Sequence, residues 1–293
     1  MNDVLPVSVV IPTVGRAELL ADCLDSISRC RPRAAEVVVV DQSGERAVHA
    51  LVSRLTGARV LFSAVRDRGL AVNLGMREAG HEIVLVTDDD CTVSTSWIGT
   101  AWSHLSADPA AILTGRVLPA GDPAAIPSTI DAEVSRDYTG ELHYGALYGG
   151  NMACNRSRFL AFGGFDERVR FAEDNDFCYR WLRAGRSLRY DPSFLIWHHA
   201  WRSPADLEHH LLAYARGQGL FYAKHLRRGD LRVARFLMRD LYRGARGAAA
   251  RVVRGRSEWP DHRAGLLRGV LIGLVAGWRG NSGKSRPRKH NKR

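Results

Sequence analysis

The chain lacks a long apolar run, and this absence limits the classes of protein to which it can belong. Of its 293 residues 45% are hydrophobic, which suffices for a packed core. No stretch reaches the ~18 consecutive apolar residues that a membrane-spanning helix needs. The first apolar run, at residues 7–11, follows no basic segment and ends at Pro12, so the sequence predicts neither a spanning helix nor a secretory signal.

Cysteine is scarce and has no metal-binding spacing. The chain has five cysteines and no CxxC pair: Cys23, Cys30, Cys91, Cys154 and Cys178. An odd number without a regular framework is typical of reduced, buried thiols and argues against a disulfide scaffold or a structural zinc site. We therefore expect a cytoplasmic setting.

Two glycine-rich phosphate-binding motifs are also missing. No GxGxxG follows the first apolar run, which argues against a dinucleotide-binding oxidoreductase. The segment at 12–16, Pro-Thr-Val-Gly-Arg, is a poor version of the Lys-containing loop that a nucleotidyltransferase would use. A metal-dependent nucleotidyltransferase, which also uses paired acids and Mg²⁺, stays as an alternative.

Charge divides the chain into two parts. Residues 1–199 carry 20 basic and 25 acidic side chains, whereas residues 200–293 carry 22 basic and 6 acidic ones. The acidic part can hold a cation, and the basic part is expected to meet an anionic partner.

Strand and helix patterns alternate through the first 90 residues. Short β-branched runs predict strands at 7–11, 36–40, 58–62 and 82–87, and helical spacing predicts helices at 17–29, 47–55 and 69–79, the last with Gly80 as its C-cap. This alternation predicts an α/β fold with a mostly parallel sheet that helices flank on both faces.

The remaining chain is less regular. Loops with a strand around 112–118 are expected over 108–150, followed by a helix at 171–185 and a strand at 194–197. Residues beyond 203 look helical and basic. We expect a catalytic domain over 1–203, a basic helical extension over 204–280 and a disordered tail over 281–293.

Acidic residues follow two of the predicted strands. Asp41 follows the second strand, and Asp88, Asp89 and Asp90 follow the fourth. Ligands bind beyond the carboxyl ends of the strands in such sheets. Three adjacent carboxylates repel one another unless a cation lies among them, and Mg²⁺ or Mn²⁺ prefers oxygen ligands. A solvated acidic turn is the alternative, and Asp41 could equally be turn chemistry.

Other candidates are weaker when each is taken alone. Arg68 and Asn73 accompany a helix start, where phosphate binds well. Glu173, Asp174 and Asp176 open another helix and could supply a general base, although the helix dipole alone favours acids there. His198 could bind a metal or a diphosphate, or be structural. Double glycines, as at 149–150, allow close approach of a ligand or form a tight turn.

Taken in order, these segments resemble family 2 of the nucleotide-sugar glycosyltransferases over about residues 6–200. The resemblance includes the first strand, the turn after Val40, the helix start at Arg68, the metal motif at 88–90 and the acidic helix start at Glu173. It implies a GT-A-type fold, an inverting displacement and a divalent cation, Mg²⁺ or Mn²⁺.

The resemblance also implies roles for single residues. Thr13 and Asp41 would contact the base of the donor, Arg68 and Asn73 the nucleotide or phosphates, with Asp88 and Asp89 beside them. Asp90, Asp88 and His198 would hold the metal. Asp174 would be the general base, with Glu173 beside it. On the acceptor side we place Gly150, Asn151 and Asp176.

The basic extension is expected to bind a membrane surface. Residues 266–278 form an apolar run interrupted by Arg268, which suits a helix lying in an anionic membrane interface. A helical cap on the catalytic domain is the alternative, and nucleic-acid binding is disfavoured because no reading motif is present.

We therefore expect a hexosyl- or deoxyhexosyltransferase on the inner face of the cell membrane. Its donor would be a nucleotide diphosphate-sugar, UDP above the others. Its acceptor would be a glycan, lipid-linked, in polysaccharide or cell-envelope biosynthesis. A non-catalytic membrane scaffold with the same fold is the alternative. The sequence does not predict an oligomeric state.

Overall fold

A computed structural model describes residues 3–140, 143–254, 259–260, 263 and 265–279. The tail expected at 281–293 lies outside the described residues. The chain forms two compact units, one of Met1–Glu167 with Glu173–Leu207 and the other of Arg168–Ala172 with Glu208–Arg293.

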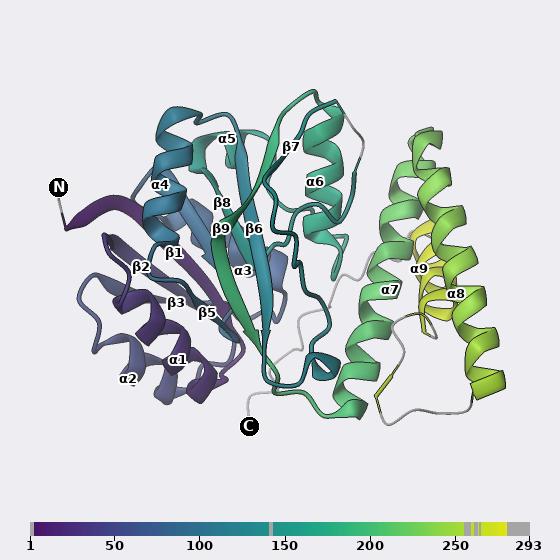
Figure 1. The fold of residues 1–293 in the computed structure, drawn as a ribbon, viewed down its shortest axis with the longest axis horizontal. Coiled ribbons are helices and arrows are strands. Elements are labelled where there is room, and N and C mark those ends of the chain that lie inside the picture. Colours follow the sequence, from purple (N-terminus) through teal and green to yellow (C-terminus); the bar gives the residue numbers. More distant parts are fainter. Residues whose placement is uncertain (1–2, 141–142, 255–258, 261–262, 264, 280–293) are drawn as a thin grey trace, which may run out of the picture. The chain divides into compact units, whose positions relative to one another are not determined.

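The first half of the central sheet is parallel, as the alternating pattern predicts. Its strands lie in the order β3-β2-β1-β4, and Figure 1 labels the first three of them. They are β1 (Val4–Thr13), β2 (Arg33–Asp41), β3 (Ala58–Phe62) and β4 (Ile83–Thr87), connected by α1 (Ala17–Ser28), α2 (Arg46–Val52) and α3 (Arg68–Glu78). Thr13 pairs with Asp41 in the register of β1 and β2, so the strand ends that carry the acids share one edge.

The second half of the sheet is mixed. It comprises β8 (Asn151–Asn155), β6 (Ile112–Ala120), β9 (Leu188–His199), β5 (Cys91–Val93) and β7 (Arg136–Tyr138). β8 runs antiparallel to β4 and β6, β6 runs parallel to β9, and β5 and β7 run antiparallel to β9. The register of β5 with β9 places Cys91 opposite His198, so β9 brings its C-terminal end to the acids that follow β4.

Helices cover both faces of this sheet because side chains alternate along the buried strands. Val9 and Leu85 belong to the core on one face, which includes Trp97 of α4 (Trp97–Ala107). Val10 and Val86 belong to the core on the other face, with Phe177 of α6 (Glu173–Arg183). The remaining short helices of this unit are α5 (Arg156–Ala161) and the 3₁₀ turn η1 (Pro123–Ala125). The α/β fold class is confirmed.

The predicted glycine cap of α3 is wrong. The helix ends at Glu78, and its C-cap is Ala79 in an extended conformation with φ −60° and ψ 136°. Gly80 instead donates its N–H to Glu36 Oε2 across 2.8 Å. A carboxylate from β2 therefore fixes this turn, and no left-handed residue is needed.

Three long helices make up most of the second unit: α7 (Pro204–Leu226), α8 (Ala234–Arg254) and α9 (Leu266–Trp278), with the 3₁₀ turn η2 (Leu231–Val233) before α8. Small residues let α7 and α9 approach closely. A Cβ on Gly273 would lie 2.0 Å from the carbonyl oxygen of Arg216, and one on Gly219 would lie 2.3 Å from that of Val270. Among the described residues, no helix is long and apolar enough to cross a membrane.

Candidate active site

The acids that follow β4 differ in their exposure to solvent. Asp89 is fully buried and Asp90 is 3% exposed, while the side chain of Asp88 keeps 19% of its surface. Thr13 donates its hydroxyl to Asp89 across 2.6 Å, and Arg16 pairs with both Asp89 and Asp90. The ends of β1 and β4 are therefore joined through these acids.

Asp90 has donors on several sides. Its Oδ2 accepts from Trp201 Nε1 at 2.8 Å, from Arg202 Nη2 at 3.2 Å and from Arg16 Nη1 at 3.2 Å. Burial alone would raise the pKa of Asp90, but His198 and the guanidinium groups of Arg16 and Arg202 outweigh it and hold this pKa well below its usual range. The charge of Asp90 is therefore stabilised by several hydrogen-bond donors of the protein.

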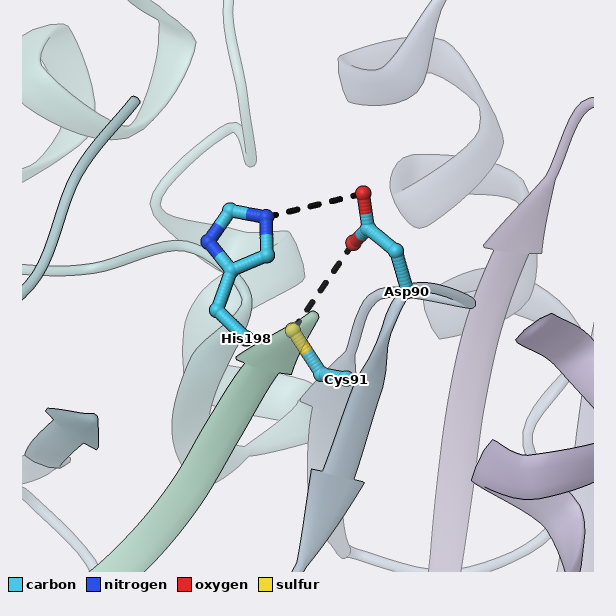
Figure 2. Close-up of side chains that lie close together, drawn as sticks. All are labelled: Asp90, Cys91 and His198. Carbon is cyan, nitrogen blue, oxygen red and sulfur yellow. Dashed lines mark hydrogen bonds and ion pairs between the residues drawn. The ribbon is translucent and has the colours of Figure 1, made fainter. Parts of the chain in front are cut away.

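Asp90, Cys91 and His198 form the one cluster of metal-ligating side chains found among the described residues, with ligand atoms within 4.8 Å of one another (Figure 2). His198 Nε2 lies 3.5 Å from Asp90 Oδ2, and Tyr148 Oη lies 3.0 Å from His198 Nδ1. Burial, together with the nearby acids, raises the pKa of the Cys91 thiol well above its usual value, and the Cys91 Sγ atom lies 3.8 Å from Asp90 Oδ1. Carboxylate oxygen and imidazole nitrogen suit Mn²⁺, and Asp90 and His198 thus fit a divalent cation.

A second group of carboxylates, Glu173 and Asp174, lies at the start of α6, and Arg68 connects it to Asp88. Arg68 Nε donates to Asp88 Oδ1 at 2.7 Å, and Nη1 lies 3.4 Å from Glu173 Oε1. Asp174 Oδ2 accepts the backbone N–H of Gly149 at 3.2 Å. Asp88, which the resemblance implied as a metal ligand, thus contacts the guanidinium group and is not part of the Asp90–His198 cluster.

At positions 149 and 150 any side chain larger than that of glycine would collide with the charged residues of this site. A Cβ on Gly149 would approach Arg68 Nη1 to 2.9 Å, and one on Gly150 would approach Asp88 Oδ2 to 2.4 Å. Neither glycine has a positive φ, so close approach and not backbone conformation requires glycine here.

The paired acids at the start of α6 have perturbed acidities. Burial, and then the charge of Asp174, raises the pKa of Glu173 to about 7, although Arg68 opposes the rise. Burial also raises the pKa of Asp174, again against Arg68. A carboxyl group whose pKa lies closer to neutrality is a better general base.

Three of the predicted site residues are engaged elsewhere. Asn73 donates to the carbonyl of Phe165 at 2.9 Å and accepts the N–H of the same residue at 3.0 Å. Asn151 accepts from Trp97 Nε1 at 2.9 Å and donates to the carbonyl of Phe194 at 2.8 Å. Asp176 pairs with Arg180 at 2.7 Å. Their buried polar atoms thus hold loops and strands together.

Asp41 lies at the expected strand end but shapes its own turn. Its Oδ1 accepts the N–H of Ser43 at 2.8 Å, and its Oδ2 accepts that of Gly44 at 3.0 Å. The next residue, Gln42, accepts the N–H of Asp67 at 2.6 Å. This hydrogen bond connects the turn to the start of α3, whose first residue is Arg68.

The sequence analysis missed Arg16, Tyr148, Trp201 and Arg202. The guanidinium carbon of Arg16 lies 4.5 Å from the centre of a Trp201 ring, and that of Arg202 lies 4.4 Å from it. Trp201 is 37% exposed, and its Nε1 atom donates to Asp90, so its ring lies between that acid and solvent. A signal was present in the sequence, since Trp201 and Arg202 lie two and three residues after His199, which ends β9.

Comparison with known proteins shows that the chain is similar to glycosyltransferases. The model of glycosyl transferase family 2 matches residues 8–159. The chain is 27% identical over 206 residues to the pre-mycofactocin glycosyltransferase of Mycobacterium tuberculosis, in an alignment that covers 66% of the chain. This chain spans only 42% of the length of that relative.

Solved structures share the fold at low identity. The mannosyltransferase PcManGT of Pyrobaculum calidifontis, in complex with GDP-Man and Mn²⁺, has a TM-score of 0.63 and 19% identity over 94% of this chain and 88% of its own. S. aureus TarS with UDP-GlcNAc has a TM-score of 0.54 and 15% identity over 94% and 92%. GalNAc-T7 with UDP, GalNAc and Mn²⁺ has a TM-score of 0.54 and 17% identity over 75% and 50%.

These likenesses confirm the GT-A-type fold. Because the family model covers more than half of the chain and includes Thr13, Arg68 and the three consecutive acids, the chain belongs to glycosyl transferase family 2.

Proposed function

We propose that this protein transfers a sugar from a nucleotide diphosphate-sugar, UDP above the others, to an acceptor hydroxyl with inversion at the anomeric carbon. The observation that carries the proposal is the pair of acid groups on either side of Arg68. Asp88 contacts Arg68 at 2.7 Å, and Glu173 contacts it at 3.4 Å. Adjacent donor and acceptor groups are what a single in-line displacement requires.

The donor half would be formed by Thr13, Asp41 and the acids 88–90. Arg68 Nη2 and Arg202 Nε are buried and have no hydrogen-bond partner among the described residues. An unpaired buried donor is costly, and a diphosphate oxygen would satisfy it. These two atoms therefore support binding of an anionic ligand beside Asp88 and Asp90.

Asp90 and His198 would hold Mg²⁺ or Mn²⁺, and Asp88 is kept as a candidate ligand. Arg16 and Arg202 already compensate the charge of Asp90, so a cation entering there would add to their charge. When bound, the cation would stabilise the negative charge of the departing diphosphate. Mn²⁺ is named in the structures of PcManGT and GalNAc-T7, which supports a cation of this kind here.

Asp174 would act as the general base, with Glu173 beside it. The acceptor hydroxyl transfers its proton to Asp174 while its oxygen bonds to the anomeric carbon. The bond from that carbon to the diphosphate oxygen breaks, and the nucleoside diphosphate leaves. The N–H of Gly149 at 3.2 Å and that of Asn175 at 2.7 Å orient the carboxylate. Gly150 would leave room for the sugar, and Asn151 and Asp176 would support the acceptor side from behind.

For the acceptor, we propose a glycan carried on a lipid, in polysaccharide or cell-envelope biosynthesis. Residues 1–203 would catalyse transfer, and residues 204–280 would associate with the inner face of the membrane. The basic character of this extension supports the proposal. The named relative suggests pre-mycofactocin as a second acceptor to test.

The first test is thermal stability with UDP, dTDP and GDP, each with Mn²⁺, Mg²⁺ or EDTA. A ligand that binds only the folded state raises the melting temperature. A metal-dependent rise with one nucleotide supports the site and names the donor class. No rise with any nucleotide would favour the non-catalytic scaffold, and binding of a nucleoside triphosphate in preference to every diphosphate would favour a nucleotidyltransferase.

A further inference from the structure

One face of α8 is apolar and exposed along its length. Met238, Tyr242 and Val252 are 63%, 63% and 87% exposed, and Ala245 and Ala249 between them are exposed too. These residues follow Met238 at the spacings of four, seven, eleven and fourteen that define one side of a helix. We call these five residues the outer stripe of α8.

The opposite face of α8 already packs within the helical unit. A Cβ on Gly244 would lie 2.6 Å from the backbone nitrogen of Leu267 in α9, and Asp240 accepts the hydroxyl of Tyr222 in α7 at 2.6 Å. The inner face thus accounts for the docking of α8 onto its neighbours. The outer stripe is not needed for that packing.

Arginines flank the outer stripe. Arg235, Arg239, Arg243 and Arg246 are exposed, and the guanidinium carbon of Arg246 lies 5.8 Å from the centre of the Tyr242 ring. Asp240 is the single acid in the sequence of α8, and it is buried. Arg239 Nε lies 3.4 Å from Asp240 Oδ1, and the outer surface of this helix combines apolar side chains with exposed arginines, including Arg243 and Arg246.

The outer face of α9 is shorter. Leu271, Ile272, Val275 and Trp278 are exposed there, with Arg268 and Arg279 as its exposed arginines. The sequence drew attention to this helix because its run is the more apolar one. In the structure, α8 offers the longer stripe and the larger number of arginines.

We infer that the outer stripe of α8 and its flanking arginines dock on an anionic phospholipid bilayer. This inference rests on the proposed membrane association and adds the surface that makes the contact. Apolar side chains along one helix face enter the boundary between headgroups and acyl chains, while arginines extend to the phosphates. A second copy of the chain is disfavoured, because it would bring like charges together along the same helix. Nucleic acid is disfavoured, because it would leave Met238 and Val252 in water.

The test is sedimentation of the full chain with vesicles of neutral phosphatidylcholine and with vesicles that also contain phosphatidylglycerol. One variant is Arg243→Glu with Arg246→Glu, and another is Met238→Ser with Tyr242→Ser. The matched control, Arg54→Glu with Arg158→Glu, makes the same change of charge at exposed positions outside the helical unit. Melting temperature with and without nucleotide checks folding and the donor site independently of lipid.

We expect the wild-type chain to bind anionic vesicles in preference to neutral ones. The loss of an arginine near an anionic surface weakens binding about fivefold, so the double arginine variant should lose at least about 25-fold. The apolar variant should weaken binding as well, while the control should stay close to wild type.

Several results would overturn the inference. The control variant could lose as much vesicle binding as the α8 variants, or the α8 variants could bind vesicles as the wild type does. The wild type could also bind neutral and anionic vesicles equally. A dimer that Met238→Ser with Tyr242→Ser converts to a monomer would assign the face to a second copy. None of these results would affect a nucleotide-dependent rise in melting temperature, so failure of this surface is separable from failure of the proposed transfer reaction.

Discussion

Arg68 Nε donates to Asp88 across 2.7 Å, and the Nη1 atom of the same guanidinium group lies 3.4 Å from Glu173. One half-buried guanidinium group thus connects the acids that follow β4 with the acids that open α6. The start of α3 positions it, because Asp67 caps that helix by accepting the N–H of Leu70 at 3.0 Å. Charge at either acid group is therefore felt by the other.

Glu173 should make stability fall as pH rises. Its pKa is raised from 4.5 to about 7 in the folded chain, first by burial, so between these values the folded state binds more protons than the unfolded state. The contribution of Glu173 to stability is therefore most favourable below pH 4.5 and declines up to about pH 7. Glu173→Gln should remove up to about 3 kcal/mol of this decline. Urea unfolding of the metal-free chain at pH 5 and pH 8 measures it; an equal pH dependence in both proteins would contradict the assignment.

Asp174→Asn should abolish transfer while leaving donor binding nearly intact. The amide keeps the size of the side chain but cannot take the proton of the acceptor, and a positioned base contributes about 10²- to 10⁴-fold. Single-turnover transfer together with the nucleotide-dependent rise in melting temperature separates the two effects. Asp176→Asn serves as a comparison on the same helix, and we expect it to lower stability, because Asp176 pairs with Arg180 at 2.7 Å. Loss of donor binding in Asp174→Asn would sink the assignment of the base.

Gly150→Ala should damage the site although the change is small. The added methyl group would lie 2.4 Å from Asp88 Oδ2, so Asp88 or the loop must move, at a cost of about 1–3 kcal/mol. Gly265→Ala is the control, since a Cβ there meets nothing within 4 Å. Melting temperatures with and without nucleotide report both effects. A Gly150→Ala protein that matches Gly265→Ala in both would show that the loop yields easily.

Tyr148→Phe should weaken metal binding without removing a ligand. The Tyr148 hydroxyl lies 3.0 Å from His198 Nδ1, and groups that orient a ligating histidine typically contribute about 10- to 100-fold to metal affinity. Titration of Mn²⁺ at saturating nucleotide measures the change. Tyr242→Phe, at an exposed position, should have no effect. Unaltered affinity in Tyr148→Phe would indicate that His198 is not a ligand.

The parallel half of the sheet could be predicted because its buried strands are continuous β-branched runs, such as the four valines at 37–40. The mixed half could be predicted only in part, since the strands expected around 112–118 and at 194–197 lie within β6 and β9, whereas its short strands were not predicted. β5, β7 and β8 have three to five residues each and include polar ones, so they leave no clear period. Trp97 to Ala107 forms a helix that the sequence analysis did not predict.

Some residues of the candidate site could be predicted from the sequence, and others could not. Acids that follow parallel strands could be predicted as site residues, because the carboxyl ends of neighbouring parallel strands lie at the same edge of the sheet. Asn73 and Asn151 bond to backbone atoms inside the fold, and a sequence alone does not distinguish such a polar residue from one that contacts a ligand. Arg16 and Trp201 come from segments that follow β1 and β9, and their meeting at Asp90 depends on tertiary structure.

The glycines of α9 carry a last implication. Gly269, Gly273 and Gly277 face Ala215, Gly219 and Ala223 or their neighbours on α7, so backbone meets backbone along this seam. Side chains there have no room to vary. The outward residues of the same helix contribute little to the seam, and mutation can change them without disturbing how the helices are joined. Substitutions in α9 should therefore be tolerated better at its outward positions than at the glycines that face α7.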